Sequence, residues 1–285
     1  MGLARFPSPD PDAPTILALH GFTGCGLDFL PMREAIGPEA ASWICPDFMG
    51  HGKSASPAVL DPYTLPRALH LIDRARQQAA NPAKVILAAY SMGARIALHY
   101  LRYARPLPAL LISPNPGIRE PAERGERREL DQRWITMLES SPMEEFCSAW
   151  EAQPLIEPQT RLPEPLRSNL AGRRRGNNPT GLAHSLHACG TGALPSLWDH
   201  LCALPPVTLV YGETDAKYAA LCREMARANP SFRIVEISGA GHAPHLDAGR
   251  WTLAAPFADI LSVAGIPVRG QENKRPAAGM DARDT

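Results

Sequence analysis

Three residues that together could activate an oxygen nucleophile or base occur in the order serine, carboxylate, histidine. Ser91 lies between Ala89 and Gly93, where an apolar run meets a segment of helical spacing. Asp215 and His242 each follow another short apolar run. A serine hydroxyl is a weak nucleophile or base until a histidine takes its proton, and a carboxylate must fix the tautomer of that histidine. The pattern therefore predicts a catalytic triad of Ser91, Asp215 and His242.

Each partner of Ser91 has a competitor nearby in the chain. Glu213 lies two residues before Asp215, but a strand followed by the pattern G-x-x-D favours the aspartate. His245 lies three residues after His242, but the Gly-Ala-Gly run directly before His242 suits a tight loop that presents a side chain. We therefore assign the carboxylate role to Asp215 and the base role to His242.

The segments around Ser91 predict how it is positioned. Residues 84–90 form a short apolar run typical of a buried strand, and residues 93–105 have apolar side chains at helical spacing. A strand, a tight turn with small residues around a serine, and a helix form the nucleophile elbow of α/β-hydrolases. In that fold, the loop after an earlier strand and the residue after the nucleophile supply two N–H donors to the oxyanion hole. Phe22 and Met92 are the candidate donors, and His20 is interpreted as a structural residue that orients the first loop.

The composition limits the possible functions. The chain has 285 residues, 45% of them hydrophobic, with 29 Lys plus Arg and 29 Asp plus Glu. Its formal net charge is therefore zero, and nothing in the charge balance indicates binding to nucleic acid. The six cysteines are scattered without a CxxC pair, and we expect neither a metal site nor disulfides. The glycine-rich loop at residues 47–54 lacks P-loop spacing. No signal peptide or membrane span is apparent, and the sequence predicts a cytoplasmic protein.

Apolar runs alternate with helical segments, which predicts a mostly parallel, doubly wound α/β sheet covered on both faces. The alternation stops after residue 113 and resumes near residue 207. The charged helical stretches between them, at 120–140, 142–150 and 182–186, indicate an inserted helical cap. The predicted organisation is a loose segment at 1–14, a core at 15–113 and 195–264, a cap at 114–194 and a disordered tail at 265–285.

Arginines in and beneath the cap suggest the kind of substrate. Arg95 follows Ser91 by four residues, on a helix directly below the predicted nucleophile, and further arginines cluster at 119–128 and 173–175. Arginine suits fork-like recognition of carboxylates. A solvated basic face would explain any single cluster, but several arginines near a serine site favour a small polyanionic substrate, whereas a lipase cap would be apolar.

The motifs together resemble the MenH family, the 2-succinyl-6-hydroxy-2,4-cyclohexadiene-1-carboxylate synthases, over about residues 17–261. The resemblance rests on LHGFTG at 19–24, D-x-x-GHG-x-S at 47–54, YSMGAR at 90–95, ER-x-x-RR-x-x-D at 123–131, RRRGNN at 173–178, GE-x-D-x-K at 212–217 and GAGH at 239–242. It implies an α/β-hydrolase fold with a helical cap, and the same triad. The substrate-binding residues that it implies are Tyr90, Arg95, Arg127, Trp150 and Arg174.

The resemblance implies a lyase of menaquinone biosynthesis that removes pyruvate from a cyclohexene polycarboxylate. In that reaction Ser91, activated by His242, would abstract a ring proton, and no metal or organic cofactor is required. Two alternatives stay open: a serine hydrolase of carboxylic esters or C–C bonds, using Ser91 as nucleophile, and a binding protein without catalysis. The intact triad argues against the second, and the sequence leaves the oligomeric state undetermined.

Overall fold

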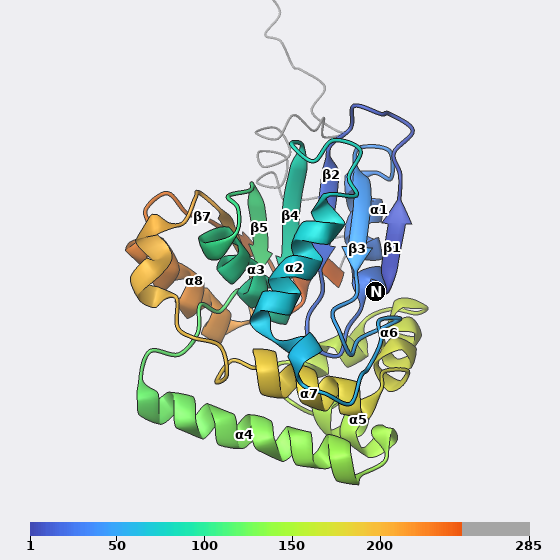
Figure 1. Ribbon diagram of the computed structural model, residues 1–285, viewed down its shortest axis with the longest axis vertical. Helices are drawn as coiled ribbons and strands as arrows, with labels where there is room; N and C mark the ends of the chain where they lie inside the picture. The colour runs from blue at the N-terminus through green and yellow to red at the C-terminus, as the bar shows by residue number, and fades with distance from the viewer. Residues whose placement is uncertain (247–285) are drawn as a thin grey trace, which may run out of the picture.

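The computed structural model describes residues 1–246. Its centre is a seven-stranded sheet in the order β1-β3-β2-β4-β5-β6-β7, parallel except for β1, which pairs with β3 antiparallel (Figure 1). The strands are β1 (Leu3–Phe6), β2 (Thr15–Leu19), β3 (Ser42–Pro46), β4 (Val85–Tyr90), β5 (Ala109–Ile112), β6 (Thr208–Gly212) and β7 (Arg233–Ile237). The predicted doubly wound, mostly parallel α/β sheet is confirmed.

The sheet forms because its central strands are apolar on both faces. Every residue of β2, β4, β5 and β6 is buried, as parallel strands covered on two sides require. The edge strand β7 has an alternating, partly exposed pattern instead. Helices α2 (Leu65–Arg76), α3 (Met92–Tyr103) and α8 (Ala216–Ala228) cover one face, and α1 (Leu30–Ile36) covers the other (Figure 1).

A cap of helices crosses the carboxyl ends of the parallel strands (Figure 1). It consists of α4 (Pro121–Ser140), α5 (Met143–Glu151), α6 (Leu166–Arg175) and α7 (Pro179–Cys189). Apolar side chains of α4, α5 and α7, among them Ile135, Phe146 and Leu182, form a small core of their own. The predicted cap helices correspond to α4, α5 and α7, whereas the sequence analysis missed α6 and the short helix α1. Short 3-10 segments complete the described chain: η1 (Gly26–Phe29), η2 (Asp61–Tyr63), η3 (Glu157–Arg161), η4 (Trp198–Ala203) and η5 (Pro244–Leu246).

The expectation that residues 1–14 form a loose segment is wrong for β1. Residues Leu3–Phe6 pair with β3, with Leu3 opposite Pro46 and Phe6 opposite Trp43. Four residues are too few for an alternation of apolar and polar side chains to identify a strand. The stability of β1 comes from its backbone hydrogen bonds to β3. The last part of the predicted core, residues 247–264, and the predicted tail at 265–285 lie outside the described residues. No helix within residues 1–246 is long and apolar enough to cross a membrane.

Candidate active site

Ser91 occupies a sharp turn between β4 and α3. Its φ is 49° and its ψ is −109°, a left-handed conformation that costs free energy for a residue with a Cβ. Gly93 makes the turn possible, because a Cβ at that position would lie 2.3 Å from the Leu19 carbonyl oxygen. The strand–turn–helix pattern around Ser91 thus forms the elbow that the sequence predicts.

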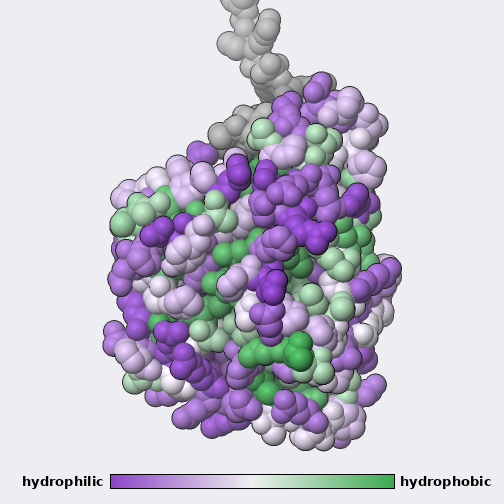
Figure 2. All heavy atoms as spheres, viewed as in Figure 1, coloured by the Kyte–Doolittle hydropathy of each residue, from purple (hydrophilic) through white to green (hydrophobic). Residues whose placement is uncertain are grey.

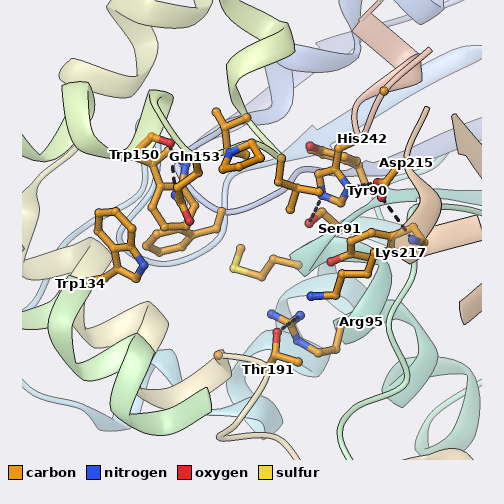
Figure 3. Close-up of a pocket in the computed structure, with 18 of the residues that line it drawn as sticks. Tyr90, Ser91, Arg95, Trp134, Trp150, Gln153, Thr191, Asp215, Lys217 and His242 are labelled. Atoms are coloured by element: carbon orange, nitrogen blue, oxygen red, sulfur yellow. Dashed lines mark hydrogen bonds and ion pairs between the residues drawn. The ribbon is translucent and has the colours of Figure 1, made fainter. Parts of the chain in front are cut away.

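The structure joins Ser91, His242 and Asp215 by hydrogen bonds (Figure 3). His242 Nε2 lies 3.1 Å from Ser91 Oγ, and His242 Nδ1 lies 2.8 Å from Asp215 Oδ2. Asp215 also accepts a hydrogen bond from the Tyr218 backbone N–H at the start of α8. With Nδ1–H donating to the carboxylate, Nε2 is free to accept the serine proton.

Burial sets the charge state of His242. The imidazole is 3% exposed, and burial lowers its pKa below the usual 6.5, partly offset by the hydrogen bond and charge of Asp215. Burial disfavours the charged imidazolium, so the neutral ring predominates near pH 7. His242 is therefore in the protonation state that a general base requires.

The two competitors lie elsewhere. Glu213 accepts hydrogen bonds from Ser238 Oγ and the Gly239 backbone N–H on the surface. His245 is fully buried, with its ring centroid 4.3 Å from that of Tyr90, and burial lowers its pKa to about 3. Ser91, His242 and Asp215 are instead joined to one another by hydrogen bonds, so the geometry favours Asp215 and His242.

The two candidate oxyanion donors flank Ser91. Met92 is the first residue of α3, where helical N–H groups have no intrahelical acceptor. Phe22 follows Gly21, whose backbone approaches so closely that a Cβ there would lie 2.7 Å from the Tyr90 ring and 3.5 Å from Ser91 Cβ. His20 holds this loop, because its Nε2 accepts from the Phe48 N–H at 3.0 Å and its Nδ1 lies 2.8 Å from the Gly21 carbonyl oxygen.

A cavity of about 510 Å³ opens above Ser91 between the sheet and the cap, with one cationic and one aromatic side. Arg95 and Lys217 lie near the triad, whereas Trp134 and Trp150 line the opposite side (Figure 3). The predicted residues that line it are Ser91, Asp215, His242, Phe22, Met92, Tyr90, Arg95, Arg127 and Trp150. The site thus combines an activated serine with positive charge and an apolar wall.

The cations of the cavity are held by different contacts. Buried Arg95 donates to Thr191 Oγ1 at 2.7 Å and to the Cys189 carbonyl oxygen at 3.1 Å, and its Nε has no partner in the described structure. Arg127 Nε lies 2.9 Å from Asp131 Oδ1. Burial, followed by the charge of Arg127, lowers the pKa of Lys217. Three cationic side chains therefore line the cavity, and their charges suit an anionic ligand.

Sequence reasoning did not assign a role to Lys217. The residue was visible within the motif GE-x-D-x-K, two positions after Asp215, but nothing in the local pattern indicates where its side chain points. In the structure the first turn of α8 directs Lys217 into the same cavity as Arg95 (Figure 3).

Arg174 lies outside this cavity, unlike the other residues implied by the resemblance. It lines a separate small cavity behind Tyr90. Its guanidinium pairs with Glu151 at 2.6 Å and donates to Gln159 Oε1 at 3.0 Å. Gln159 in turn lies 3.5 Å from the Tyr90 hydroxyl. Arg174 therefore reaches the site through other side chains.

The end of α6 fastens the cap to the loop that carries Phe22. Asn177 is 6% exposed; it donates to the Thr23 carbonyl oxygen at 2.8 Å and accepts from the Gly52 N–H at 2.9 Å. Thr23 itself has a φ of 66°, a conformation that surrounding contacts must maintain. Arg173 adds an ion pair to Asp28 at 2.9 Å.

Comparison with known proteins agrees with the fold. The model of the alpha/beta hydrolase family matches residues 16–255, and the chain belongs to this family. A protein of Photorhabdus laumondii, 2-succinyl-6-hydroxy-2,4-cyclohexadiene-1-carboxylate synthase, is 33% identical over 82% of this chain and 81% of its own length. A Bacillus subtilis (strain 168) protein, to which the same synthase activity is provisionally ascribed, is 34% identical over 82% of this chain and 86% of its own.

A solved structure leads to the same group. The structure of MenH from S. aureus superposes with a TM-score of 0.81 at 26% identity, covering 92% of this chain and 98% of its own. Within the α/β-hydrolases, the chain thus belongs to the family of 2-succinyl-6-hydroxy-2,4-cyclohexadiene-1-carboxylate synthases, a family of lyases.

Proposed function

We propose that the protein eliminates pyruvate from 2-succinyl-5-enolpyruvyl-6-hydroxy-3-cyclohexene-1-carboxylate to give 2-succinyl-6-hydroxy-2,4-cyclohexadiene-1-carboxylate. Membership of the synthase family supports this reaction. The observation that carries it is the cationic side of the cavity, where Arg95, Arg127 and Lys217 face the bonded pair Ser91 and His242.

The substrate's charges match that wall. The substrate bears three carboxylates, on the succinyl chain, the ring and the enolpyruvyl group. The guanidinium forks of Arg95 and Arg127 suit bidentate contacts with carboxylates, and Lys217 supplies a compact charge. Asp215 is the one acidic residue that lines the described cavity, and its carboxylate is engaged by His242. A tricarboxylate would therefore balance the positive charges of Arg95, Arg127 and Lys217 without displacing Asp215 from His242.

In the proposed reaction the serine oxygen acts as a base. Ser91 Oγ takes a ring proton while its own proton passes to His242 Nε2. The electrons of the broken C–H bond form the new ring double bond, and the C–O bond to the enolpyruvyl group breaks. The departing enolate takes the proton back from His242 to become pyruvate. The imidazolium that forms transiently is stabilised by Asp215, and the N–H groups of Phe22 and Met92 stabilise negative charge on oxygen.

The aromatic side of the cavity excludes water from this chemistry. The Phe22 and Trp150 rings lie 5.1 Å apart in an edge-to-face arrangement, and the Trp134 and Trp150 rings are also 5.1 Å apart. Charge-assisted bonds are stronger where water is absent. The aromatic wall therefore strengthens the contacts that the cations make to the bound carboxylates.

A serine hydrolase is the second candidate, because Ser91 in a strained turn beside two possible oxyanion donors could also attack a carbonyl. The test is to supply the cyclohexene precursor to the purified protein and to measure pyruvate and conjugated-diene absorbance together. The proposal expects equal amounts of both products. Failure to turn over the precursor, with rapid hydrolysis of p-nitrophenyl esters through an acylated Ser91, would establish the hydrolase instead.

A further inference from the structure

A second cavity lies behind the active site, on the face of the molecule that α2 covers. It has a volume of about 400 Å³ and is bounded by α2, η2, the start of α3 and the end of α7. Met92, Ser185 and Cys189 line both this cavity and the active-site cavity. The two spaces are thus separated by a single layer of side chains, one of which directly follows the nucleophile.

The floor of the second cavity is apolar. Phe48, Leu71, Ile96 and Met92 line it, and Ile96 is 1% exposed. Protein sites for small organic molecules have about this volume, and most of their lining is apolar with a few polar groups that fix orientation. The floor therefore favours a flat or compact apolar group.

The rim of the second cavity is cationic. Arg67 and Arg74 line it from positions two turns apart on α2. Arg67 pairs with Asp61 at 2.8 Å, whereas no ion pair joins the Arg74 guanidinium to another residue of the described chain. The rim thus holds two arginines against one carboxylate, a net charge that favours an anion.

The surface shows the same division. In Figure 2 hydrophilic side chains cover the middle of this face, where α2 lies in Figure 1, and hydrophobic side chains gather below them, toward α7. The exposed hydrophobic residues of the neighbouring segment are Val59 and Leu60. A ligand with an anionic end and an apolar body would match both halves of the site.

We propose that this cavity is a second ligand site, which binds a small aromatic carboxylate. The ring would lie on Leu71 and Ile96, and the carboxylate would contact Arg74, with Arg67 beside it. Because no ion pair within residues 1–246 engages the Arg74 guanidinium, its planar fork can contact the carboxylate.

Occupation of this site is coupled to catalysis through Met92. The Met92 sulfur lies 3.9 Å from Ser185 Oγ in the shared wall. A ligand that displaces the Met92 side chain shifts the first residue of α3 and, with it, the turn that holds Ser91. The ligand therefore lowers kcat of the reaction proposed above without competing for the substrate cavity.

The test titrates the full chain with 2-naphthoate by calorimetry, which needs no assumption about the reaction. Arg74→Glu should weaken binding about tenfold or more, because it replaces a charge-assisted bond by repulsion. Arg102→Glu, the same charge change at an exposed position of α3 outside the cavity, should leave the Kd within about twofold. Ala68→Trp, which places an indole in the cavity, should abolish binding.

The outcomes are distinct. Saturable binding that depends on Arg74 and Ala68, together with a fall in kcat at constant KM for the precursor, supports the second site. Binding that survives both variants and is lost in Arg127→Ala places the naphthoate in the active site and overturns the proposal. Absence of saturable binding to the wild-type chain overturns it as well. A failure of the lyase assay alone leaves the calorimetric result intact, so the two proposals are judged separately.

Discussion

At the scale of single residues, Ser91 combines backbone strain with a hydrogen bond to His242. Its φ of 49° is unfavourable for a residue with a Cβ, and the surrounding packing, including the close approach of Gly93 to Leu19, maintains it. The conformation presents the hydroxyl to His242 Nε2 at 3.1 Å. The strained turn therefore holds the Ser91 hydroxyl in the position where it can act as a proton acceptor.

The carboxylate partner can be tested by a matched pair of variants. Asp215→Asn should lower kcat by about 10³-fold or more, because the amide stabilises neither the required tautomer nor the imidazolium. Glu213→Gln should leave kcat within about twofold, since Glu213 accepts hydrogen bonds from exposed groups of the Ser238 loop and the amide can still accept them. Steady-state kinetics with the precursor decides the matter, and equal damage by both variants would show that the carboxylate is misassigned.

Lys217 and Arg174 should have different roles, the first in binding the substrate and the second in supporting the site. Lys217→Met removes the contact that we propose to a substrate carboxylate and should lower kcat/KM for the precursor about 10- to 100-fold. It should leave the rate at which a neutral fluorophosphonate labels Ser91 almost unchanged. Arg174→Met should slow both processes, because Arg174 supports Thr23 and, through Gln159, Tyr90. Arg174→Met that spares the labelling rate would instead favour direct substrate binding by Arg174.

At the scale of elements, α6 and the residues directly after it connect the cap to the loop that presents Phe22. Variants of two adjacent asparagines, Asn177 and Asn178, can distinguish an effect on catalysis from an effect on stability alone. Asn177→Ala removes the buried bonds to Thr23 and Gly52 and should lower kcat about tenfold. Asn178→Ala removes the N-cap of α7 at an exposed position, costing about 1 kcal/mol of stability, and should leave kcat within about twofold.

Kinetics and urea unfolding of both asparagine variants provide the measurement. The prediction is a loss of kcat in Asn177→Ala that exceeds any loss shared with Asn178→Ala. If Asn177→Ala lost only stability, with kcat unchanged, the bonds from α6 would be structural and would not position the oxyanion loop.

Most elements could be predicted from the sequence because the central strands are apolar on both faces and stand out as short runs. The triad followed from the same fact, since parallel strands end at one edge and bring their following loops together. In contrast, α6 buries only Leu170 and Arg174, so it shows no apolar stripe. The direction of Lys217 and the separate position of Arg174 depend on side chains from distant segments, which local spacing does not encode.

At the scale of the whole molecule, several buried histidines should make stability depend on pH. Burial lowers the pKa of His51 and His245 to about 3, and burial with the charge of Arg95 lowers that of His99 to about 4. In the unfolded chain these groups titrate near 6.5. The unfolded state therefore binds more protons below pH 6.5, so stability is full above that pH and falls as the pH decreases toward 4.

His99→Phe tests this dependence. Neither ring nitrogen of His99 has a hydrogen-bond partner within the described chain, and phenylalanine replaces the imidazole with a somewhat larger apolar ring. Between pH 6.5 and 5, the free energy of unfolding should change less steeply with pH in the variant than in the wild type, by up to about 1.4 kcal/mol per pH unit. Urea unfolding at several pH values measures it, with exposed His70→Gln as the control. An unchanged slope would mean that His99 is not buried in its neutral form.

The claim on which the account depends is that Ser91 Oγ acts as the base that starts the elimination. The most direct measurement is the rate of pyruvate release from the precursor by Ser91→Ala relative to the wild type, with mass spectrometry of the wild-type Ser91 peptide during turnover. We predict a loss of about 10³-fold or more and no covalent adduct on Ser91. Pyruvate release by Ser91→Ala within about tenfold of wild type, or a substrate-derived adduct on Ser91, would contradict the account.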